Sequence, residues 1–197
     1  MSYSSSSTYG HEWTYDVFMS FRGEDTRKKL TSHLLERFAE NGINVFRDDV
    51  QVGMGQEISQ ALVTAIEESR LFIVVFSKNY AQSTWCLDEL VKILDCKKRK
   101  NRLILPVFYE VQPTEVRRQQ SGSFKEAMAV HQSTSNKNKV ETWKLGLQEI
   151  TSFAGIDYRM KLPLSNQSST PLKTAWKSPR LISPVLIRGR SGRSRTS

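Results

Sequence analysis

The sequence predicts a doubly wound α/β domain, with a parallel sheet and helices on both faces. Short apolar runs alternate with longer amphipathic segments from Tyr15 onward, and no tandem hairpin signal interrupts them. Residues 71–76 form a continuous apolar run, as expected of a central strand that is covered on both sides. Strands that alternate with helices form right-handed βαβ units, and such units build parallel sheets.

The first strand is expected over residues 16–21, followed by a polar turn at 22–27 and a helix over 27–40. Asp25 or Thr26 is suited to cap that helix, and Asn41-Gly42 to end it. The spacing of four apolar residues predicts the buried face of the helix. These are Leu30, Leu34, Leu35 and Phe38.

A second strand is expected over 43–46, a loop over 47–55, and a helix over 57–69 that leads into the third strand at 71–76. The helix has an apolar stripe at helical spacing, which predicts that one face packs on the sheet. The stripe consists of Ile58, Ala61, Leu62, Ala65 and Ile66.

Ser83 is placed to cap a helix over 84–100, and a fourth strand follows at 103–109. Short helical pieces are expected within 113–131, and a last helix over 139–155. The inward residues of the two long helices repeat every three or four positions. They are Leu87, Leu90, Val91 and Leu94 in the first, and Val140, Trp143, Leu147 and Ile150 in the second.

The net charge of +9 is unevenly distributed along the chain. Residues 1–157 hold 20 basic and 20 acidic side chains, whereas 158–197 hold nine basic side chains and no acidic one. We therefore expect a disordered Ser-rich segment at 1–12, a folded domain at 13–157, and a disordered basic tail at 158–197. The tail is the one segment whose charge suits nucleic acid, and a solvated end without a dedicated partner is the simpler interpretation.

The sequence also limits where the protein works. Its longest apolar run has six residues, far short of the roughly 20 that a membrane span needs. Cys86 and Cys96 lie ten positions apart on one predicted helix, about 15 Å along its axis, so they are expected to be free thiols. No Cys/His spacing fits zinc, so no metal is expected. We expect a cytoplasmic protein, with the nucleus as a second compartment.

Ligands of such sheets bind beyond the carboxyl ends of the strands, where the loops 22–27, 47–56 and 77–86 should share one rim. Several chemistries are excluded at this rim. The chain has no Gly-x-x-x-x-Gly-Lys-Ser/Thr loop, no complete dinucleotide fingerprint, no acidic phosphoacceptor after the third strand and no nucleophile elbow.

Trp85 and Glu89 stand four positions apart at the start of the helix over 84–100, so they share one helix face. An indole beside a carboxylate suits stacking of a planar ring and stabilisation of positive charge, as in glycosidic bond cleavage. By itself the pair is weak evidence, because Trp-x-x-x-Glu on an amphipathic helix is usually a packed tryptophan beside a surface acid.

Six segments, in order, resemble plant Toll/interleukin-1 receptor (TIR) domains, as found in plant immune receptors. The resemblance covers about residues 13–157, and it implies a flavodoxin-like fold with five strands and cleavage of NAD⁺ to nicotinamide and ADP-ribose-type products. The segments are YDVFMSFRGEDTR at 15–27, GINVFRDD at 42–49, AIEES at 65–69, SKNYA at 77–81, STWCLDEL at 83–90 and PVFY at 106–109.

The resemblance also implies roles for single residues, with NAD⁺ as substrate and no resident cofactor. The catalytic glutamate of the family falls on Glu89, whose carboxylate we expect to project into the crevice above the sheet. Gly55 matches the glycine of a mobile loop that helps to build the pocket across a neighbouring protomer. The residues expected to bind NAD⁺ are Phe21, Arg22, Gly23, Glu24, Asp25, Thr26, Arg27, Gly55 and Trp85.

Other TIR domains are the expected protein partners. Ser32 and His33 resemble the pair used in symmetric contacts between TIR domains, and Gly122 resembles the glycine of a second contact surface. A surface Ser-His pair and an ordinary turn glycine are the alternative interpretations of these residues.

Two functions follow from the resemblance. The first is a self-associating NAD⁺ hydrolase in immune signalling and cell death. The second is a non-catalytic adaptor or decoy that pairs with the TIR domains of full-length receptors. Met54, at a position where the family commonly has Arg or Lys, favours the second. With no further receptor region in the sequence, we expect a TIR-only protein or a truncated receptor product.

Overall fold

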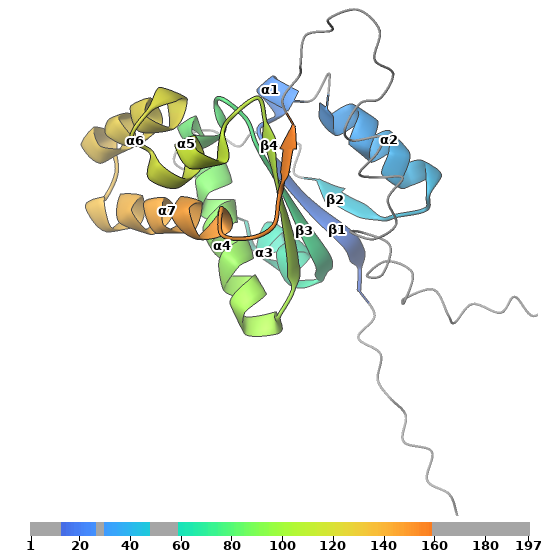
Figure 1. Ribbon diagram of the computed structural model, residues 1–197. Coiled ribbons are helices and arrows are strands. Elements are labelled where there is room, and N and C mark those ends of the chain that lie inside the picture. The colour runs from blue at the N-terminus through green and yellow to red at the C-terminus, as the bar shows by residue number, and fades with distance from the viewer. Residues whose placement is uncertain (1–12, 27–29, 48–58, 159–197) are drawn as a thin grey trace, which may run out of the picture.

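The computed structural model describes residues 13–26, 30–47 and 59–158, and their five strands form one parallel sheet (Figure 1). The strand order is β2-β1-β3-β4-β5, and every pair of neighbours is parallel. This is the flavodoxin-like order that the resemblance implies, so the predicted fold class is confirmed. The strands are β1 (Tyr15–Phe21), β2 (Val45–Arg47), β3 (Ser69–Phe76), β4 (Leu103–Tyr109) and β5 (Ile156–Tyr158).

Helices connect the strands, and two of them begin at serine caps. The Oγ of Ser83 accepts a hydrogen bond from the Cys86 amide at 3.3 Å, as predicted, and Ser59 does the same for Leu62 at 3.2 Å. The helices are α1 (Gly23–Thr26), α2 (Ser32–Glu40), α3 (Gln60–Glu67), the 3₁₀ turn η2 (Tyr80–Gln82), α4 (Thr84–Lys100), α5 (Pro113–Arg118), α6 (Gly122–Thr134) and α7 (Lys137–Ile150).

The helices lie on two faces of the sheet because the chain winds in two directions from β1. The connection through α2 leads from β1 to β2 at one edge, whereas the later connections lead back across to β3, β4 and β5. Since each crossover is right-handed, the reversal moves the later helices to the opposite face. Alternate residues of β3 accordingly belong to two core clusters. Phe72, Val74 and Phe76 face α3, α4, α6 and α7, and Leu71, Ile73 and Val75 face α2.

This reversal creates a switch point between the carboxyl ends of β1 and β3, where ligands of doubly wound sheets bind. Asp25 joins the two strand ends there. Its carboxylate accepts hydrogen bonds from the Ser77 hydroxyl at 2.5 Å, the Asn79 amide at 3.0 Å and the Asn79 side chain at 2.9 Å. The loops after β1 and β3 therefore share one rim, as predicted. The third expected loop, at 47–56, lies outside the described residues from position 48 onward.

These contacts correct one prediction. Asp25 and Thr26 do not cap α2, because both lie inside α1 and use their side chains elsewhere. The hydroxyl of Thr26 donates to the Arg22 carbonyl at 3.1 Å, and the Asp25 carboxylate accepts from Ser77 in the loop after β3. The expected apolar face of α2 is present, with Leu30 and Phe38 buried in the core.

The last predicted helix is also corrected, because α7 ends at Ile150 and β5 follows it. This strand has three residues, and its register pairs Val107 with Ile156. Gly155 allows the chain before β5 to pass close to β4, since a Cβ at this position would lie 2.7 Å from the Pro106 carbonyl oxygen. Such a short segment, with a central aspartate, carries little hydrophobic periodicity.

The structure bears on two of the features from which the compartment is predicted, the state of the cysteines and the lack of a membrane span. Cys86 and Cys96 are both buried, and they keep their thiols outside any disulfide, as expected. Among the residues described, no helix combines the length and apolar character that crossing a bilayer requires.

Replacing Gly155 by alanine should destabilise the domain by about 1–3 kcal/mol, because the new methyl group would overlap Pro106 and Phe108. Gly146→Ala is the matched control. There the methyl group would meet Leu94 and Leu90 at 3.5–3.8 Å, so the better helix former should stabilise α7 by about 0.4–1 kcal/mol. Urea unfolding of both variants measures the difference, and equal effects would show that β5 does not depend on this close approach.

Asp25→Ala should lower the free energy of unfolding by about 2–3 kcal/mol, because it removes a charged acceptor and leaves the Ser77 and Asn79 donors unsatisfied. Glu24→Ala removes a neighbouring carboxylate that is 59% exposed and should change stability by less than about 0.5 kcal/mol. Chemical denaturation of the two variants under identical conditions tests whether Asp25 holds the rim together.

Candidate functional site

Glu89 lies in the second turn of α4, and its carboxylate faces the carboxyl end of β1. One oxygen, Oε2, accepts a hydrogen bond from the Ser20 hydroxyl at 2.6 Å. The other, Oε1, accepts one from the Trp85 indole N–H at 3.0 Å. The side chain is 2% exposed. The carboxylate therefore sits beneath the rim, not open to the crevice as expected, and donors on two sides compensate for its lost hydration.

Ser20 is itself held by Tyr80 from the turn after β3. The Tyr80 hydroxyl lies 3.1 Å from the Ser20 Oγ and donates to the Cys86 carbonyl oxygen at 2.9 Å. Burial raises the pKa of Tyr80 well above its ordinary value, and the nearby Cys86 and Glu89 add to that shift. The phenol consequently stays protonated and remains a hydrogen-bond donor across the physiological range.

Arg22 brings a positive charge to the same end of the sheet. Its guanidinium donates to the Asn79 carbonyl at 3.3 Å and to the Glu24 carboxylate at 3.0 Å. The Nε is buried and has no hydrogen-bond partner among the described residues. A guanidinium with a spare donor beside the switch point is suited to an anionic group such as a phosphate.

The structure brings some of the predicted NAD⁺-binding residues together, but not all of them. Gly23, Glu24, Asp25 and Thr26 form α1 at the rim. Phe21 is 6% exposed and packs in the core cluster on the α2 face, so its side chain points away from Glu89. Arg27 and Gly55, and with them Met54, lie outside the described residues.

The predicted self-association residues lie on two different helices. Ser32 and His33 are exposed in the first turn of α2, where a second protein has access to them. Gly122 begins α6 with φ of 61°, and a Cβ there would lie 2.2 Å from the Glu115 carboxylate, which accepts from the Ser123 amide. The local backbone thus explains a glycine at this position, and its role in association stays a prediction.

Sequence reasoning missed two polar residues of the site, Ser20 and Tyr80. Ser20 is the one hydroxyl within the apolar run of β1, and its side chain is on the same face as Phe18, toward α4. A polar residue at a core-facing position of a strand was the available signal. Tyr80 gave no such signal, because its contact with Ser20 spans 60 residues of sequence.

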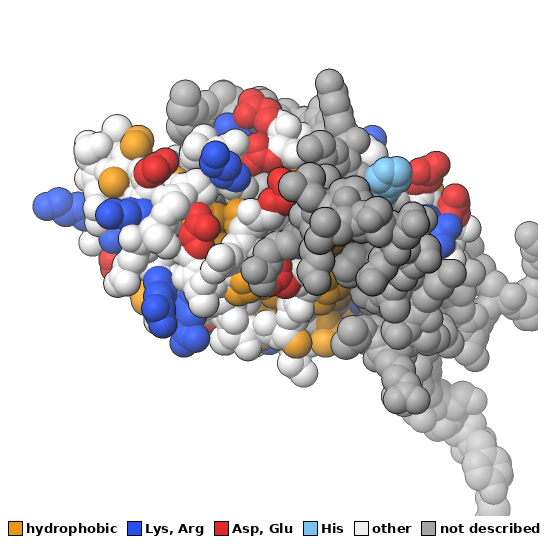
Figure 2. All heavy atoms as spheres, turned by 45° about the horizontal axis from the view of Figure 1, so that its top comes forward, with side chains coloured by type: hydrophobic (Ala, Val, Ile, Leu, Met, Phe, Trp, Pro, Cys, Tyr) orange, Lys and Arg blue, Asp and Glu red, His pale blue; other side chains and the backbone are white. Residues whose placement is uncertain are grey.

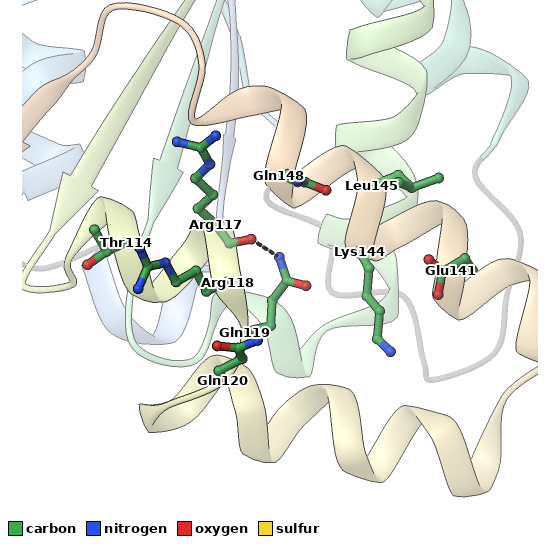
Figure 3. Close-up of a pocket in the computed structure, with 9 residues that line it drawn as sticks. All are labelled: Thr114, Arg117, Arg118, Gln119, Gln120, Glu141, Lys144, Leu145 and Gln148. Carbon is green, nitrogen blue, oxygen red and sulfur yellow. Dashed lines mark hydrogen bonds between the residues drawn. The ribbon is translucent and has the colours of Figure 1, made fainter.

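A surface pocket of about 520 Å³ lies elsewhere, between α5 and α7 (Figure 3). It contains none of the predicted site residues. Arg117, Arg118 and Lys144 line it, but their charged ends point in different directions and do not converge on one point (Figure 3). We therefore assign the candidate site to the switch point and not to this pocket.

The charge on the described surface is mixed. Figure 2, in which the α1 end of the sheet comes forward, shows acidic and basic side chains interspersed there. No group of His, Cys, Asp and Glu within the described part of the chain could hold a metal ion.

Comparison with known proteins agrees with this fold. The TIR domain family matches residues 14–166. TMV resistance protein N of Nicotiana glutinosa is 49% identical over 153 residues, which cover 76% of this chain and 13% of that protein. Disease resistance protein RPV1 of Vitis rotundifolia is 49% identical over 142 residues, 72% of this chain and 10% of that protein. This chain thus matches only a small part of each relative.

A solved structure supports the same assignment. The TIR domains in the activated Roq1 resistosome, which directly recognises the pathogen effector XopQ, match with a TM-score of 0.70 and 40% identity. The match covers 83% of this chain and 98% of that one. The chain therefore belongs to the TIR domain family.

Proposed function

We propose that this chain is an NAD⁺ hydrolase that releases nicotinamide and forms ADP-ribose-type products. The observation that supports it most directly is a buried carboxylate at the switch point of the sheet, Glu89, held by Ser20 and Trp85. Doubly wound sheets bind nucleotides at this place, and a carboxylate is the group that nicotinamide release requires.

The bond between ribose and nicotinamide breaks with its electron pair leaving on neutral nicotinamide, so positive charge develops on the ribose. Water then adds to the ribose carbon and loses a proton, which gives ADP-ribose. Glu89 opposes that charge from a largely water-free site, where an electrostatic interaction is stronger than in bulk solvent. The Ser20 hydrogen bond sets the orientation of the carboxylate in advance, so little reorganisation is needed as the charge develops.

Trp85 and Arg22 supply the remaining binding groups. The Trp85 ring is partly exposed beside Glu89 and offers a flat face to the nicotinamide or the ribose. Arg22, whose side chain is 19% exposed, offers its charge to the diphosphate. Substrate reaches Glu89 by displacing the indole N–H from Oε1, because that oxygen is otherwise engaged.

The relatives suggest the biological setting. Proteins N and RPV1 are named as resistance proteins, and the matched solved TIR domains belong to a resistosome. We place this chain in plant immune signalling and cell death, with other TIR domains as partners that complete the NAD⁺ pocket, in the cytoplasm and nucleus. The basic tail at 158–197 is the one segment suited to nucleic acid.

A second function, that of a non-catalytic adaptor or decoy for other TIR domains, is favoured by one observation. Glu89 is 2% exposed with both carboxylate oxygens engaged, as a purely structural residue would be. The two functions differ in whether a demonstrably assembled sample consumes NAD⁺.

Glu89→Gln should lower nicotinamide release by about 100-fold or more, because the amide keeps the size of the side chain but not its charge. The matched control is Glu126→Gln on the exposed surface of α6, which should retain the wild-type rate. Nicotinamide is measured by chromatography over a series of protein concentrations. Equal rates for wild type and Glu89→Gln in an assembled sample would refute the hydrolase and leave the adaptor.

His33→Ala should weaken self-association, because the imidazole is 80% exposed on α2 and free to contact a partner. Sedimentation velocity at increasing concentration measures this, with Glu126→Gln again as the control. If assembly completes the pocket, the rate per protomer should fall in parallel with the assembled fraction. An unchanged sedimentation profile would remove Ser32 and His33 from the proposed contact.

A further inference from the structure

The two oxygens of Glu89 are held by donors of very different burial. Ser20, which holds Oε2, is 1% exposed and belongs to a central strand paired on both sides. Trp85, which holds Oε1, is only partly buried and lies in the first turn of α4. The Ser20 contact is therefore the fixed one.

Tyr80 contacts the Ser20 hydroxyl and is itself fixed by burial and packing. Ser20 has one hydroxyl hydrogen, and Glu89 accepts it at 2.6 Å. The Tyr80 hydroxyl donates to the Cys86 carbonyl at 2.9 Å and lies 3.1 Å from the Ser20 oxygen, in a contact for which either hydroxyl can be the donor. Tyr80 is 0% exposed, and its ring packs edge-on against Phe76 with centroids 4.8 Å apart.

We infer that Ser20 and Tyr80 act as one positioning unit, which holds the Oε2 of Glu89 while the substrate replaces Trp85 at Oε1. The inference rests on the proposed NAD⁺ hydrolase function. Neither Ser20 nor Tyr80 touches the substrate in this scheme. Both act on the reaction through the position of the Glu89 carboxylate.

This scheme predicts which kinetic constant changes. NAD⁺ is bound through groups that do not contact Ser20, so its binding should be little affected when Ser20 is altered. Electrostatic stabilisation of the cationic ribose depends on the position of the Glu89 carboxylate. Altering Ser20 should therefore reduce stabilisation of the transition state. Ser20→Ala is thus expected to lower kcat and to spare KM.

Matched controls separate positioning from stability. Ser69 is 0% exposed, and its Oγ donates a hydrogen bond of 2.6 Å to the Ala65 carbonyl at the opposite end of β3 from Ser77. Ser69→Ala is therefore the same substitution at a site of equal burial, remote from Glu89. Tyr109→Phe controls for Tyr80→Phe, because the Tyr109 hydroxyl is buried and has no hydrogen-bond partner among the described residues.

The experiment measures kcat, KM and the melting temperature of the full chain for wild type, Ser20→Ala, Tyr80→Phe, the double variant and both controls, in assembled samples. Ser20→Ala should lower kcat about tenfold or more with KM within about twofold of wild type. The double variant should match Ser20→Ala within about twofold, because residues that act as one unit are not additive. Both controls should keep the wild-type kcat, whatever their melting temperatures.

Three results would overturn the inference. The first is that Ser20→Ala has a kcat within twofold of the kcat of Ser69→Ala. The second is that Ser20→Ala raises KM and leaves kcat unchanged. Multiplicative losses in the double variant are the third, since they would show two independent effects. If Ser20→Ala does not fold, Tyr80→Phe against Tyr109→Phe gives the same comparison. A failure of the proposed hydrolase function is recognised separately, because wild type and Glu89→Gln would then release nicotinamide at equal rates.

Discussion

A buried, hydrogen-bonded carboxylate constrains much of this structure. Ionised Glu89 would be costly to bury without partners, and among the described residues Ser20 and Trp85, which lie on different elements, donate to it. Ser20 comes from β1 and Trp85 from α4, so the carboxylate stays satisfied only while that strand and helix keep their relative position. The residues that hold the candidate site together therefore also hold α4 against the sheet.

The location of this carboxylate follows from chain handedness. Right-handed crossovers that run in opposite directions from β1 place α2 on one face and α4 on the other. The resulting switch point lies between the carboxyl ends of β1 and β3, which are neighbours in the sheet. Asp25 and Arg22 bridge these ends through Asn79. The rim is thus a product of the winding and is held by two polar side chains.

The sequence was sufficient where the signal was local. The apolar run of β3, the serine cap of α4 and the shared helix face of Trp85 and Glu89 could all be read from spacing. Ser20 and Tyr80 could not be paired in this way, because 60 residues separate them and spacing within one element does not link it to another. The role of Asp25 was misread for a related reason. An aspartate near a helix start suits a cap, and only the tertiary structure places Ser77 and Asn79 within its reach.

The burial of Glu89 has an energetic consequence for the proposed reaction. A hydrogen bond to a charged group contributes about 1.5–3 kcal/mol. The open form, in which Trp85 no longer donates to Oε1, is then populated in roughly 1–10% of isolated protomers. The apparent affinity for a substrate that needs the open form falls by the same fraction. A neighbouring protomer that binds the open form better would recover this loss. Under the proposed function, activity that rises with assembly would then follow from one indole–carboxylate contact, with Ser20 keeping the carboxylate in place while the indole is displaced.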